Sequence, residues 1–289
     1  MSRRFSETIQ FTNMVNHDDR YVVVSVEQYS SVSEVAHDCS IRPVRINGYG
    51  NFEHKIPNNP EFYGVSSYNE ALDLMRYGYQ PIVTKIHEKM HTIHHHPSKR
   101  VTFENNIYGF APVVPLSLIC VPNSMVNTTI KPIKCKVIDL FYDGGATCGY
   151  SAQQMIDAGA MLLSAILNME NSGYRFNLHI ADSYCDSSNL DILSVKVKDS
   201  NKPLDLKKIS FPLAHSAFFR VIGFDWQSKS PAAHDLGWGR GQSIATHYCS
   251  DCQVVGTSLV KQVFGHNAVY ISGEKIIDDG MDYIQGCLL

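Results

Sequence analysis

The chain has 289 residues, of which 44% are hydrophobic and 18% charged, a balance typical of a globular protein rather than a disordered one. Its 25 basic and 28 acidic residues give a formal net charge of −3, so no overall basic field favours nucleic acid as a partner. The first ten residues, MSRRFSETIQ, have no apolar signal-peptide core, and no stretch is apolar enough to span a membrane. We therefore expect a cytoplasmic protein that does not bind membranes, with its eight cysteines reduced.

Residues 1–130 predict an N-terminal α+β region. The β-branched residues of segment 21–26 predict a buried strand. Residues 46–63 contain two glycines and two prolines and predict turns, and residues 108–133, with four prolines, predict an irregular connection.

Two helices are predicted between these segments. Ser67 is a candidate N-cap for a helix over about residues 68–77. Pro81 suits the first turn of a second helix, over about residues 81–93, because a missing N–H costs little there. Pro97 ends the pattern.

The second helix leads into the sequence HEKMHTIHHH, residues 87–96, whose first five residues match H-E-x-x-H. In that motif two histidines one turn apart bind zinc and the glutamate is the general base, here Glu88. Pro97 stands where a third histidine would follow at the familiar spacing. Catalytic zinc, a non-catalytic metal site and a solvated helix face all remain open, and the histidines that share this stripe are His87, His91, His94 and His95.

The centre of the chain has the regular order of an α/β unit. The segment 136–142 predicts a strand, and Ser151 is a candidate N-cap for a long helix that ends near residue 170. Further strands are predicted over residues 174–180 and 190–197. A strand, a helix and a strand in this order predict a parallel sheet with a right-handed crossover.

The last part of the chain predicts a helix over residues 212–224, a strand over 268–272 and a helix over 276–288. Between them, residues 228–252 form a loop rich in glycine and serine. A boundary near residue 130 and a single domain with an N-terminal elaboration are both compatible with this order.

The loop contains two groups of candidate binding residues. Cys249 and Cys252 have the spacing of a zinc-binding pair, to which His247 could add a third ligand. Incidental thiols are the alternative. Trp238 and Arg240, in a glycine-rich stretch that matches neither nucleotide-binding fingerprint, are candidates for a contact with another protein.

Three stretches carry a resemblance: VIDLFYDGGATCGYSAQQMIDAGAMLLSAILNMENSGYRFNLHIAD, FPLAHSAFFRVIGF and, upstream, FYGVSSYNEALDLMRYGYQ. The order of strand, turn with small and hydroxyl residues, long helix, strand, hairpin-like strand and helix resembles the von Willebrand factor A class of α/β domains. It also resembles a group of phage and prophage proteins of that shape. The resemblance implies a Rossmann-like, largely parallel sheet over residues 133–289.

The resemblance also implies a place for a cation. The class binds a divalent cation such as Mg²⁺ through an Asp-x-Ser-x-Ser triplet after its first strand, and the matching positions here are Asp143, Gly145 and Thr147. Gly145 has no side-chain oxygen, so the chain departs from the triplet. Asp182, near the end of the following strand, is a further candidate ligand because carboxyl ends of parallel strands meet at one edge. A turn without metal is the alternative.

We expect from this a phage-encoded protein that binds a host or phage protein, or its own copies, without turnover. A zinc-dependent hydrolase using His87, His91 and Glu88 is the alternative. A nucleic-acid-associated phage protein is a second alternative, which the acidic balance disfavours.

Overall fold

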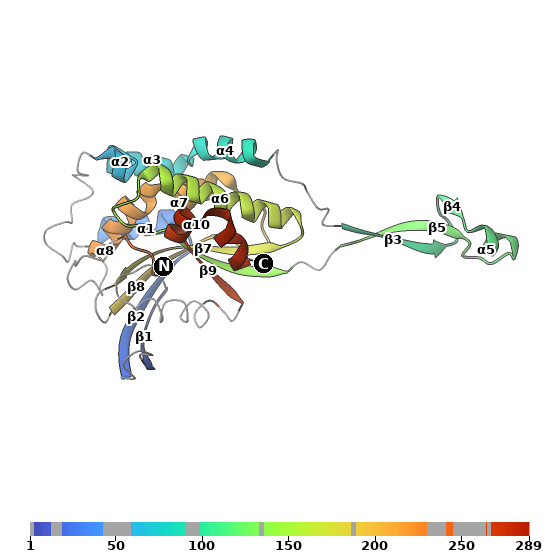
Figure 1. The fold of residues 1–289 in the computed structure, drawn as a ribbon, viewed down its shortest axis with the longest axis horizontal. Helices are drawn as coiled ribbons and strands as arrows, with labels where there is room; N and C mark the ends of the chain where they lie inside the picture. The colour runs from blue at the N-terminus through green and yellow to red at the C-terminus, as the bar shows by residue number, and fades with distance from the viewer. Residues whose placement is uncertain are drawn as a thin grey trace.

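The computed structural model of the protein describes residues 3–12, 19–42, 59–90, 99–132, 136–185, 189–229, 241–244, 264 and 267–288. Within these ranges a body built on one sheet carries an arm that extends away from it (Figure 1). The described helices include none with both the length and the apolar character needed to cross a lipid bilayer.

The body is a mixed α/β structure around a six-stranded sheet in the order β1-β2-β8-β7-β6-β9. Strand β6 is parallel to β7 and β9, whereas β8 is antiparallel to β7 and parallel to β2, and β1 is antiparallel to β2. Three of these five pairings are parallel. The strands are β1 (Arg3–Thr12), β2 (Asp19–Tyr29), β6 (Val137–Asp143), β7 (Arg175–Cys185), β8 (Asn189–Lys198) and β9 (Ala268–Ser272).

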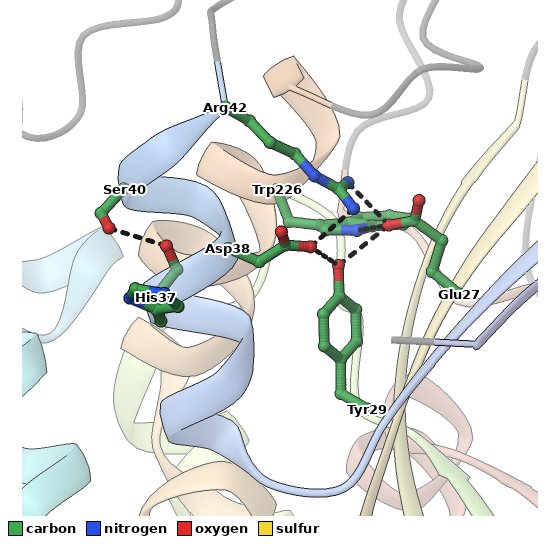
Figure 2. Close-up of polar contacts among 7 residues, drawn as sticks. All are labelled: Glu27, Tyr29, His37, Asp38, Ser40, Arg42 and Trp226. Atoms are coloured by element: carbon green, nitrogen blue, oxygen red, sulfur yellow. Dashed lines mark hydrogen bonds and ion pairs between the residues drawn. The ribbon is translucent and has the colours of Figure 1, made fainter. Parts of the chain in front are cut away.

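Strands from both sides of residue 130 share this sheet, because β2 pairs with β8 from Val23↔Asn189 to Tyr29↔Val195. A buried polar network strengthens the junction. The Glu27 carboxylate of β2 accepts hydrogen bonds from Tyr29 (3.0 Å), Arg42 (2.9 Å) and Trp226 (2.8 Å), as Figure 2 shows. Burial acts to raise the pKa of Glu27, but these donors outweigh it and hold the pKa below its ordinary value.

The helices cover the sheet in tiers. Helices α6, α7 and α10 lie over one face of the sheet, and α3 and α4 pack on α6 and α7 (Figure 1). The described helices of the body are α1 (Val32–Ile41), α2 (Pro60–Tyr63), α3 (Tyr68–Tyr77), α4 (Gln80–Met90), α6 (Ala152–Asn171), α7 (Leu206–Ala214), the π-helix η1 (Phe218–Gly223), α8 (Phe224–Lys229) and α10 (Gly273–Leu288).

The predicted helix starts are confirmed where a hydroxyl caps them. The side chain of Ser67 accepts from the N–H of Glu70 at the start of α3. Ser151 forms a complete capping box with Gln154 at the start of α6. The helix expected over residues 212–224 is wrong: α7 already begins at Leu206, the backbone turns extended at His215, and a π-helix follows. The apolar pattern missed Asp205, whose carboxylate caps α7 seven residues earlier.

The irregular connection expected over residues 108–133 is also wrong. Residues 99–132 form an arm with the strand order β3-β5-β4 and a short helix. The prolines sit where they are tolerated: Pro112 and Pro132 end strands, and Pro115 lies in the first turn of the helix. The arm contains β3 (Lys99–Asn106), β4 (Ala111–Pro112), α5 (Val114–Leu118) and β5 (Met125–Pro132).

Gly159 sets the close contact between α6 and α7. A Cβ added there would lie 2.5 Å from the Cα of Ala214 and 2.6 Å from its Cβ. We expect Gly159→Ala to lower the free energy of unfolding by about 1 to 2 kcal/mol, because overpacking outweighs the better helix propensity of alanine. Denaturant unfolding measures the change. Gly286→Ala in α10 is the matched control, since its Cβ would meet nothing within 4 Å, and it should be neutral or stabilising. Equal effects of the two variants would contradict the packing argument.

Candidate functional site

The candidate site lies at the carboxyl ends of β6 and β9. Helix α6 carries the chain from β6 to β7 on one side, whereas β9 pairs with β6 on the other side. The two strands are parallel, and the helices that follow them, α6 and α10, pack on one another over the same face of the sheet. In open α/β sheets ligands bind outside the carboxyl ends of the strands.

Asp143 is the last residue of β6 and is fully buried. Its Oδ2 accepts from the N–H of Ile244 at 2.7 Å and from the hydroxyl of Tyr270 at 2.8 Å. Burial raises the pKa of Asp143 to about 6 although these hydrogen bonds favour the charged form. A carboxyl group that changes protonation close to neutral pH thus stands at the strand end.

Glu274, in the first turn of α10, is the second acid of the site and is 2% exposed. Its carboxylate accepts from the backbone N–H and the hydroxyl of Thr147. Burial raises the pKa of Glu274 to about 7, and the charge of Asp143 acts in the same direction. A buried acid whose charge is disfavoured by a second buried acid can hold a proton, or a cation in its place.

Arg220 of the π-helix holds the turn after β6. This fully buried side chain donates from Nη2 to the carbonyl oxygens of Thr147 and Tyr150, both at 2.8 Å. Nη1 donates to the carbonyl of Phe62 at 2.9 Å, and the guanidinium lies 3.9 Å from the centroid of the Phe62 ring. Burial lowers the pKa of Arg220 to about 10, so it stays charged. We therefore assign it a positioning role for the turn that carries Thr147.

Residues 241–244 cover the site. The hydroxyl oxygens of Ser243 and of Ser272, at the end of β9, lie 2.6 Å apart. On the β7 side, the Ser183 hydroxyl donates to the carbonyl of Gln242 at 3.3 Å. This segment closes the strand ends from solvent, which explains the burial of Asp143.

The donor set determines what the site could bind. Asp143 and Glu274 supply carboxylate oxygens and Thr147, Ser243 and Ser272 supply hydroxyl oxygens, a set suited to a hard cation. Among the described residues no group of three or more histidines, cysteines, aspartates and glutamates has the geometry of a metal site. The two acids would therefore need hydroxyl, backbone or water oxygens to complete a coordination shell.

A comparison with protein-family models gives one match, a family described as a domain of unknown function, DUF7192, over residues 10–280. The chain belongs to this family. No curated protein and no solved structure matches it. The match covers β2 to β9 and the arm, whereas most of β1 and the end of α10 lie outside it.

In this DUF7192 member, the predicted residue Thr147 donates to Glu274, and the charge of the predicted residue Asp143 helps to raise the pKa of Glu274. Asp182 is not part of the group. Ala181 is the register partner of Asp143, so the next residue, Asp182, points to the opposite face of the sheet. There its Oδ2 accepts from Nε2 of Gln227 in α8 at 3.0 Å.

The other predicted site residues lie largely beyond the described part of the chain. The backbone of His87 and Glu88 is helical within α4, but their side chains are not among the described ones. Metal binding and protein contacts at these positions therefore stay predictions. Those wholly outside the described residues are His91, His94, His95, Trp238, Arg240, His247, Cys249 and Cys252.

Sequence reasoning missed Glu274 and Arg220. Glu274 had a usable signal, because it lies two residues after the predicted strand 268–272, and the carboxyl ends of parallel strands meet at one edge of a sheet. Arg220 had none: its flanking apolar residues mark a buried segment, but the carbonyl groups that it binds lie in two distant segments, α2 and the turn after β6.

Proposed function

We propose that this protein acts by binding another protein, without turnover, and that residues 99–132, the arm, are its binding element. One observation carries the proposal: no residue from 102 to 129 is buried. The same arm carries seven of the eleven large hydrophobic side chains that are exposed among the described residues. They are Phe103, Ile107, Tyr108, Phe110, Val114, Leu118 and Ile119.

The absence of buried residues from 102 to 129 supports binding for an energetic reason. Two or three strands are marginally stable unless they bury an apolar face against something else. In addition, residues 105–130 contain no Asp, Glu, Lys or Arg. Depletion of charge together with exposed aromatic residues is characteristic of the core of protein interfaces. A partner that covers the arm would supply the missing core.

The body fits the same proposal. Our proposal includes a von Willebrand factor A-like architecture for the body. It also includes a phage origin for the protein, with a host or phage protein as the partner. The order β6, turn, α6, β7, antiparallel β8 and α7 supports the first of these.

A second candidate function is cation binding between Asp143 and Glu274. The observation that favours it is the pair of buried acids with raised pKa values at the carboxyl ends of β6 and β9. Oxygen ligands of this kind suit Mg²⁺ rather than Zn²⁺. A zinc hydrolase at His87, His91 and Glu88 stays the alternative, and it requires about one equivalent of zinc in untagged protein.

Excision of the arm tests the leading proposal. Lys99 pairs with Pro132, so a short glycine-serine linker can replace residues 99–132 without displacing their neighbours. We expect the shortened chain to keep the thermal stability of the body and to lose both partner capture and self-association. The measurements are calorimetry, affinity capture from the source lysate and light scattering.

Leu118→Glu is the matched point variant, because this side chain is 78% exposed and its replacement leaves the body untouched. It should weaken partner binding without changing the melting temperature. Capture of the same partner by the armless chain, with unchanged affinity, would refute the arm as the binding element.

A further inference from the structure

Strand β3 offers an unpaired edge along its whole length. In the order β3-β5-β4 it is the terminal strand, and all eight of its residues pair with β5 on the other side, from Lys99↔Pro132 to Asn106↔Met125. Within the described residues no strand pairs with its outer edge. Such an edge presents a row of N–H and C=O groups that can add a further strand.

We propose that β3 pairs antiparallel with β3 of a second copy of this chain, about a two-fold axis at Thr102. The inference rests on the proposed function of the arm and names a second occupant for it. The two arms would form one continuous sheet in the order β4-β5-β3-β3-β5-β4. A two-fold contact of this kind is self-complementary and closes as a dimer.

The charges along β3 select this register. A two-fold axis perpendicular to the sheet relates side chains that point to the same face of the sheet. An even-numbered residue of one copy therefore stands opposite an even-numbered residue of the other, and an odd-numbered residue opposite an odd-numbered one. With the axis at Thr102, Arg100 of each copy stands opposite Glu104 of the other. With the axis at Phe103, Arg100 would stand opposite Asn106 and the charge pairs would be lost. With the axis at Val101, Glu104 would stand opposite a residue outside β3.

The remaining positions agree with the same register. Thr102 faces Thr102, and Phe103 of each copy faces Val101 of the other. Threonine pairs, aromatic pairs with β-branched residues and opposite charges are the cross-strand combinations that stabilise antiparallel sheets. The side chain of Phe103 is 68% exposed, and its ring centroid lies 6.4 Å from that of Phe110. In the dimer it would gain a further neighbour across the β3–β3 pairing. The tip of the arm, with Leu118, stays available for the protein partner.

A charge swap tests the register in the full-length chain. We expect the wild-type protein to dimerise in sedimentation-velocity and light-scattering measurements. Arg100→Glu and Glu104→Arg alone should each weaken dimerisation about tenfold, because each places like charges opposite one another twice. The double variant restores opposite charges in this register alone, and its dimerisation should return to within about threefold of wild type. Lys202→Glu, on the body and 71% exposed, is the matched charge change and should have no effect.

Each other outcome overturns the inference. If neither single variant weakens dimerisation, or if the double variant does not restore it, the contact between the copies lies elsewhere. A monomeric wild-type chain that still captures its partner refutes self-pairing and leaves the proposed function intact, whereas loss of both refutes both. A monomer that sediments with phosphatidylcholine vesicles through its arm would make a lipid surface the occupant.

Discussion

Replacement of Arg220 by methionine is expected to lower the free energy of unfolding by about 4 kcal/mol and the melting temperature by roughly 10 °C. The carbonyl oxygens of Phe62, Thr147 and Tyr150 lose a charged donor, and a buried acceptor without a partner costs about 1 to 3 kcal/mol. Methionine fills much of the volume, so the loss reports on hydrogen bonds more than on a cavity. Calorimetry and denaturant unfolding measure it.

Two further variants separate the causes. Arg220→Lys keeps the charge but cannot contact three carbonyl groups as a planar fork, so an intermediate loss is expected. Arg76→Met is the matched control, because this side chain is 62% exposed and forms a long ion pair of 3.8 Å with Asp73. It should change the stability by less than about 0.5 kcal/mol. If Arg220→Met melted like Arg76→Met, the turn after β6 would not depend on the guanidinium.

Replacement of Glu274 by glutamine is expected to stabilise the protein at pH 8 by about 2 to 3 kcal/mol relative to wild type, and far less at pH 5. The folded pKa of Glu274, about 7, lies above its ordinary value, so its stabilising protonated form is fully present below about pH 4.5. That contribution is lost as the pH rises through 7. Asp143 behaves alike through about pH 6. Glutamine still accepts from Thr147 but carries no charge.

The measurement is the difference between variant and wild type at each pH, by denaturant unfolding. Burial lowers the pKa values of His179 and His215 to about 4, so their contribution to the stability of the fold is lost as the pH falls through that value. This pH dependence is opposite to that of Glu274. It is the same in the variant and the wild type, so the difference between them cancels it. A variant that gained as much at pH 5 as at pH 8 would contradict the raised pKa of Glu274.

The same pair of proteins tests the cation. Magnesium chloride at pH 8 should raise the melting temperature of the wild-type chain and leave Glu274→Gln unchanged, since only the former has both carboxylates. An equal response of the two proteins would remove cation binding between Asp143 and Glu274 and leave the pH prediction standing.

Local signals explain which elements were predictable. Ser67 and Ser151 cap their helices through N–H groups three residues away, and the apolar spacing of α6 lies within one segment. The turn at Asp143 was predictable because two glycines follow it directly after the strand 136–142. The arm escaped prediction because its prolines resemble those of a loop until their positions at strand ends and in a helix turn are seen.

The sequence by itself determined the starts of α3 and α6, the strands β2, β6, β7, β8 and β9, and the site members Asp143 and Thr147. Tertiary structure alone decided the rest, since those contacts join distant segments. The hydrogen bond from Thr147 to Glu274 spans 127 residues and that from Arg220 to Thr147 spans 73. No local propensity encodes such pairs. They form because β9 and the π-helix reach the same sheet edge, where burial then raises the pKa values of both acids.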